Sequence, residues 1–150
     1  MLPQTPPTAE GDLGQTPYAH LAVYMLDRRL TGELFLIEPN DVIHAVRFER
    51  GAPVKIRMDD GYARLGELLL EEGLVSEEAI EGAVRTGGLL GDVLVLAGCV
   101  ESAALNEVLM KQFVKRSLRL FELPDTTSYK YFEDSEALKD WGGDPACIEP

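Results

Sequence analysis

The sequence predicts an α+β domain in which a small antiparallel sheet packs with helices and two αα-hairpin repeats are inserted between its strands. Three observations lead to this class. Residues 33–57 have the period and turn residues of a three-stranded meander. Residues 65–109 carry one helical pattern written twice, and residues 128–132 form a late, aromatic strand.

The N-terminal segment has two parts. Residues 1–15 contain three prolines and two glycines with few apolar side chains, so we expect a flexible leader there. The domain itself is expected over residues 16–134. Thr16 followed by Pro17 is typical of a helix start, and a helix from Pro17 to about Leu30 would place Tyr18, Leu21 and Met25 on one face.

The predicted meander consists of strands at 33–37, 42–48 and 53–57. Pro39-Asn40-Asp41 and Arg50-Gly51 supply its turns. Pro53 is suited to an edge strand, where its missing N–H interrupts no ladder. We expect helices to cover one face of this sheet and the strand at 128–132 to extend it.

The helical pattern of residues 65–76 recurs at 90–101 with an offset of 25 residues, inside an insert expected over 62–112. Each copy begins Leu-Gly, and a small glycine there would let helices approach closely. Gly73 and Gly98 are predicted helix caps with positive φ, and Ser76 is a predicted N-cap. Cys99 takes the position of Leu74, which predicts a small buried side chain.

A long helix is expected from residue 101 or 102 to about 123. Its predicted buried arc contains seven apolar residues: Leu105, Leu109, Met110, Phe113, Val114, Leu120 and Phe121. Lys111, Lys115 and Arg119 recur every fourth residue opposite this arc, and we interpret this basic stripe as a candidate surface for an acidic protein partner. Residues 135–150 are expected to form a short helix over 135–141 and a linker toward further domains.

Composition excludes several functions. The chain has 26 acidic and 14 basic residues, a net charge of −12, which argues against nucleic-acid binding. It has no apolar run of membrane-spanning length, and its two cysteines, Cys99 and Cys147, indicate no disulfide framework, so we expect a cytoplasmic protein without membrane insertion.

The sequence also lacks motifs typical of catalytic, phosphate-binding or metal sites. It contains no nucleophile elbow or phosphate loop, and neither His20 nor His44 has a cysteine or carboxylate at ligand spacing. We therefore expect no catalytic residues, no metal site and no enzymatic activity.

Short motifs resemble PATAN-type domains, which are adaptor modules of bacterial signalling proteins. The resemblance covers about residues 11–132. It rests on a TGxL strand at 31–34, an FxxGxPV hairpin at 48–54, and the closing aromatic strand at 129–132. It implies a non-catalytic protein–protein interaction module of bacterial cytoplasmic signalling or motility, without a cofactor.

A second resemblance covers residues 64–112. The pattern from Arg64-Leu65-Gly66 onward is similar to the repeats in N-terminal domains of type II secretion and pilus ATPases, some of which bind cyclic di-GMP. The first copy keeps the arginine of the pattern, Arg64, but has Gly87 at the glutamine position. The second keeps the glutamine, Gln112, but has Leu89 in place of the arginine. This resemblance implies the alternative function, a cyclic di-GMP sensor using Arg64 and Gln112.

Overall fold

The computed structural model of the chain describes residues 2–138 and confirms the α+β class. The chain divides into two compact units. One contains the residues up to Asp60 together with those from Arg116 onward, and the other is Gly61–Lys115. The second unit begins one residue before the insert expected over 62–112 and ends three residues after it.

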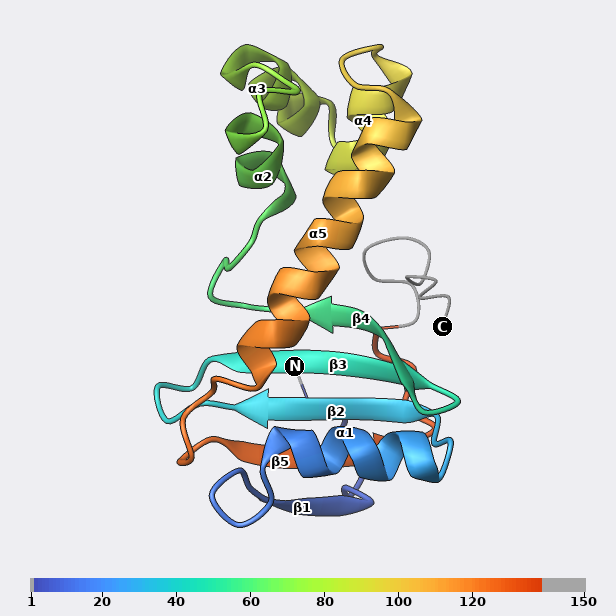
Figure 1. Cartoon of the computed structure of the whole chain (residues 1–150), viewed down its shortest axis with the longest axis vertical. Coiled ribbons are helices and arrows are strands. Elements are labelled where there is room, and N and C mark those ends of the chain that lie inside the picture. The colour runs from blue at the N-terminus through green and yellow to red at the C-terminus, as the bar shows by residue number, and fades with distance from the viewer. Residues whose placement is uncertain (1, 139–150) are drawn as a thin grey trace. The chain divides into compact units, whose positions relative to one another are not determined.

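The first unit is built on a five-stranded antiparallel sheet with the order β1-β5-β2-β3-β4 (Figure 1). The predicted meander is present, and β5 adds to it beside β2, as the sequence predicts. The strands are β1 (Ala9–Asp12), β2 (Gly32–Ile37), β3 (Ile43–Glu49), β4 (Ala52–Arg57) and β5 (Ser128–Glu133). Pro53 lies in β4, which is an edge strand as expected.

β1 is absent from the sequence prediction. The segment expected as a flexible leader contains this strand, which pairs with β5, and Leu13 behind it is buried. The sequence Ala9-Glu10-Gly11-Asp12 has neither β-branched residues nor alternation, so its extended form depends on pairing with β5. Gly11 is needed there, because a Cβ would lie 2.9 Å from the Tyr129 ring.

Strands β2 and β3 are buried on both faces of the sheet, whereas the sequence predicts cover on one. On one face, which carries Leu34 and Val46, α1 (Tyr18–Asp27) buries Tyr18 and Met25, and it runs along the direction of the strands in Figure 1. The helix is shorter than predicted, and Pro17 rather than Thr16 is its N-cap. On the opposite face, Leu2 and Leu138 pack with Phe35, Ala45 and Phe132.

A buried carboxylate holds the segment after β5 against this second face. Glu33 is fully buried and accepts hydrogen bonds from Ser135 Oγ and from the backbone N–H groups of Ala137 and Leu138. Arg47 lies beside it and donates to the Ser135 carbonyl at 3.0 Å. The short helix predicted over 135–141 is not seen over residues 135–138, and the rest of that prediction lies outside the described residues.

The second unit contains helices in the predicted order. They are α2 (Leu65–Glu71), α3 (Glu77–Thr86), α4 (Leu90–Leu96) and the first part of α5 (Ser102–Leu120), which ends in the first unit. Helices α2 and α4 begin 25 residues apart, which matches the repeat. That each helix pair packs as an αα-hairpin remains a prediction.

Glycines allow the two copies to meet. A Cβ on Gly66 would lie 3.5 Å from a Leu90 methyl group, and a Cβ on Gly91 would lie 3.5 Å from a Leu65 methyl group. Each Leu-Gly pair therefore contacts the leucine of the other copy. Gly73 and Gly98 have φ of +68° and +75°, and Ser76 Oγ accepts a hydrogen bond from the Ala79 N–H, as predicted.

Two predictions of burial in this region are wrong. Cys99 is exposed, and its counterpart Leu74 is only half-buried. Along α5 the buried arc is narrower than half the circumference. It includes Leu105, Phe113, Leu120 and also Val108, but four residues predicted in the arc are exposed: Leu109, Met110, Val114 and Phe121.

Candidate functional site

Fewer side chains of the basic stripe are available to a partner than the sequence predicts. Lys111 donates a hydrogen bond to Glu72, which raises the pKa of the lysine, and Arg119 donates to Asp60. The division between the units falls after Lys115, so Arg119 belongs to the first unit and Lys111 and Lys115 to the second. Two of the three cations are thus engaged with acids of the same chain, which reduces the positive charge available to a partner.

The two residues of the alternative nucleotide site do come close together. Gln112 Nε2 donates to the backbone carbonyl of Ala63 at 2.9 Å, and Ala63 directly precedes Arg64, the exposed N-cap residue of α2. The Arg64 guanidinium lies against Gly61, where a Cβ would approach its Nε to 2.7 Å. The structure therefore places the one retained arginine and the one retained glutamine at neighbouring positions.

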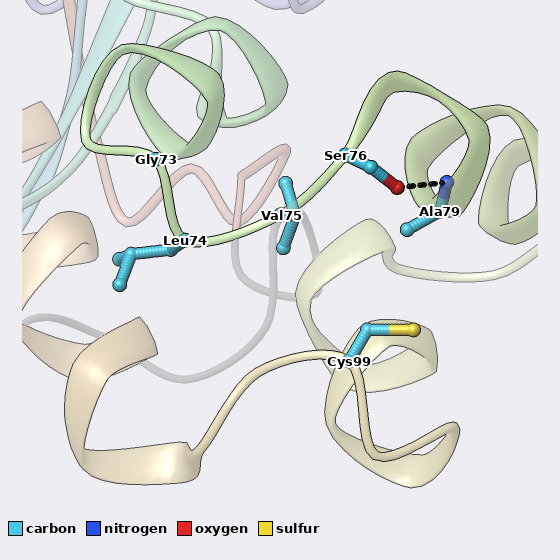
Figure 2. Close-up of a pocket in the computed structure, with 6 residues that line it drawn as sticks. All are labelled: Gly73, Leu74, Val75, Ser76, Ala79 and Cys99. Atoms are coloured by element: carbon cyan, nitrogen blue, oxygen red, sulfur yellow. Dashed lines mark hydrogen bonds between the residues drawn. The ribbon is translucent and has the colours of Figure 1, made fainter.

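An open depression joins the helix junctions of the two copies. Figure 2 shows its six lining residues, which are Gly73, Leu74, Val75, Ser76, Ala79 and Cys99. Leu74 and Cys99 are equivalent positions of the repeat, 25 residues apart. The Ser76 hydroxyl is 3.1 Å from the Ala79 nitrogen, so it is occupied in capping α3.

Among the described residues of the first unit, five large hydrophobic side chains are exposed, and one of them, Tyr24, has its ring covered by the Arg28 guanidinium. The other four face solvent. Val23 and Leu26 of α1 are 65% and 61% exposed, and Leu118 and Phe121 at the end of α5 are 61% and 56% exposed. Each pair is three residues apart, the spacing of neighbours on one helix face. The Phe121 ring contacts the buried Tyr18 ring at the start of α1. We call Val23, Leu26, Leu118 and Phe121 the exposed quartet.

Large apolar side chains in solvent make the quartet a candidate interaction surface. Single exposed apolar residues are common on soluble proteins, but grouped ones mark interaction sites more often. Sequence reasoning missed the quartet because it placed Phe121 in the buried arc of α5 and made no prediction for Leu118 or Val23. Only the exposed fractions of the side chains in the folded structure show which apolar residues stay in solvent.

Carboxylates do lie next to His44, contrary to the spacing argument. His44 Nε2 is 2.7 Å from Glu38 Oε2, and one donor atom each from Glu38, His44 and Asp60 lies within 4.8 Å of the others. The sequence contained a signal for the first pair. Ile37 pairs with Ile43 across the β2–β3 turn, so Glu38 and His44 are diagonal neighbours on one face of the hairpin.

Comparison with known proteins adds no family. No protein-family model matches the chain, and no curated protein and no solved structure is significantly similar to it. Among residues 2–138, no helix is long and apolar enough to cross a membrane.

Proposed function

We propose that the chain is a non-catalytic protein–protein interaction module of a bacterial cytoplasmic signalling or motility protein. The observation that carries this proposal is the exposed quartet, in which four large apolar side chains on α1 and at the end of α5 stay in solvent. Burying such side chains against a partner gains about 25 cal/mol for each Å² of apolar surface removed from water. The TGxL and FxxGxPV motifs, which resemble those of adaptor domains, support the same function.

The partner is expected to present an apolar surface. Exposed aromatic and aliphatic residues at the centre of an interface commonly provide most of the binding energy. The chain's net charge of −12 acts at longer range and disfavours acidic partners except where local cations face them. Lys115 of the basic stripe is exposed on α5. It is therefore the best residue at which to test local attraction of an acidic group on the partner.

Site-specific photo-cross-linking tests the proposal directly. A photoreactive phenylalanine analogue at Val23 should cross-link a protein partner in cells, because this side chain lies in the quartet. The same analogue at Glu81, which is exposed on α3 of the other unit, is the matched control. Equal cross-linking from both positions, or none from Val23, would contradict binding through the quartet.

A cyclic di-GMP sensor is the second candidate, favoured by the proximity of Arg64 and Gln112 in the second unit. An arginine guanidinium is well suited to phosphate oxygens. Against this candidate, the Gln112 amide already donates to the Ala63 carbonyl.

Titration calorimetry with cyclic di-GMP separates the two functions. A sensor should bind the nucleotide and lose binding in Arg64→Ala, while Arg85→Ala, an exposed arginine of α3, should bind normally. If the wild-type chain releases no heat, the sensor function is excluded and the interaction module remains.

A further inference from the structure

Three neighbouring strands bring a set of metal-ligand side chains to one end of the sheet. Glu38 follows β2, His44 is the second residue of β3, and Asp60 comes after β4. Because β2, β3 and β4 are adjacent and antiparallel, the last residues of β2, the first residues of β3 and the last residues of β4 lie at the same end of the sheet. The donor atoms of the three residues lie within 4.8 Å of one another, all in the first unit.

The histidine of this cluster is buried and only partly satisfied. His44 is fully buried, with Nε2 2.7 Å from Glu38 Oε2. Among the described residues, its Nδ1 has no hydrogen-bond partner. The two nitrogens of an imidazole point in different directions, so an ion would bind at Nε2, beside Glu38, and Nδ1 would stay outside the ligand set. The carboxylates are more accessible, since the side chains of Glu38 and Asp60 are 14% and 22% exposed.

We propose that Glu38, His44 and Asp60 form a binding site for a divalent transition-metal ion, with Zn²⁺ as the best match. One imidazole nitrogen and two carboxylate oxygens make a three-ligand set of the kind that zinc accepts, with water in the remaining position. With a neutral imidazole the three ligands carry two negative charges, which a divalent cation balances. The sheet already gathers the ligands, and a bound ion would replace the hydrogen bond between His44 and Glu38.

Nearby cations have to be included in this argument. Arg119 donates a hydrogen bond to Asp60 Oδ2, and Arg116 donates to the Ile56 carbonyl at 3.1 Å close to Asp60. These positive charges weaken the affinity for a cation. The bond from Arg119 also fixes the Asp60 carboxylate, as hydrogen bonds to ligating carboxylates commonly do in metal sites.

Titration calorimetry with Zn²⁺ on the full chain tests the site. Cys99→Ser and Cys147→Ser should be present in every sample, so that no thiol competes for the metal. We expect one equivalent of Zn²⁺ to bind near neutral pH. Glu38→Gln, Asp60→Asn and His44→Gln should each weaken binding by at least about tenfold, since even changes outside the ligand set cost that much in known sites.

His20→Gln is the matched control. It removes the only other histidine of the chain, which is exposed on α1, and it should leave zinc affinity unchanged. Should His44→Gln fail to fold, Glu38→Gln and Asp60→Asn, whose side chains reach solvent, still test the site, with circular dichroism as the check on folding. Absence of zinc binding to the parent chain, or unchanged affinity in folded Glu38→Gln and Asp60→Asn, would overturn the proposal.

Discussion

The rings of Tyr18 and Phe121 meet edge to face, with centroids 5.0 Å apart and planes at 81°. Tyr18 is only 5% exposed, whereas Phe121 is 56% exposed. One ring therefore belongs to the core and the other extends that core to the surface. Aromatic pairs in this geometry contribute about 0.5–1.5 kcal/mol beyond their burial, so the contact also fixes the position of the exposed ring.

The repeat of the second unit should depend on one leucine and tolerate loss of another. Leu94 is fully buried in the core cluster, whereas Leu96 on the same helix is 88% exposed. Leu94→Ala should lower the free energy of unfolding by about 2–5 kcal/mol, while Leu96→Ala should change it by less than about 0.5 kcal/mol. Urea denaturation measures both, and equal midpoints would show that α4 is not packed as described.

Replacing two glycines of the same unit with alanine should change the stability of the protein in opposite directions. Gly73 has a φ of +68°, where a Cβ is disfavoured by about 1–2 kcal/mol although no neighbouring atom is close. Gly82 lies inside α3 with open space around its Cα, so alanine there should stabilise by about 0.5–1 kcal/mol. Thermal unfolding of Gly73→Ala and Gly82→Ala checks the signs, and stabilisation by Gly73→Ala would contradict the cap.

Stability should fall at alkaline pH because of Tyr131. Burial raises the pKa of Tyr131 from the ordinary value of 10.0 to about 12, and Glu133 and Asp134 act in the same direction. Between these values the folded protein retains a proton that the unfolded chain releases, so stability that is complete below pH 10.0 is lost as pH rises toward about 12.

Urea midpoints measured at several pH values across this range show how steeply stability declines with pH. Tyr131→Phe should flatten the decline but not abolish it, because burial also raises the pKa of Tyr18. A decline as steep in Tyr131→Phe as in the wild type would remove Tyr131 as a cause.

Local sequence predicts most of the secondary structure here. Alternation and turn residues locate β2, β3 and β4 to within one residue, and Gly73 and Gly98 mark helix ends that the structure confirms. These features follow from short-range physics, in which φ preferences and side-chain periodicity act within a few residues.

Features that depend on distant segments were not predictable in the same way. β1 forms because Ala9–Asp12 pairs with β5, which lies more than a hundred residues later in the sequence. The burial of Glu33 depends on backbone donors at Ala137 and Leu138, and the approach of Asp60 to His44 depends on the pairing of β3 with β4. Likewise, periodicity alone assigned Phe121 to the buried side of α5.

The affinity for the protein cross-linked at Val23 tests the central claim most directly. The double substitution Leu118→Glu with Phe121→Glu places two charges in the quartet, while Leu96→Glu places one at an even more exposed apolar position of the other unit. Thermal unfolding should show that both variants stay folded, with a loss of about 1 kcal/mol for the Tyr18 contact in the double variant.

We predict that the double variant binds this partner at least about tenfold more weakly than the wild type, which corresponds to about 1.4 kcal/mol, and that Leu96→Glu binds normally. Unchanged affinity of the folded double variant, or an equal loss in Leu96→Glu, would contradict an interaction surface formed by α1 and the end of α5.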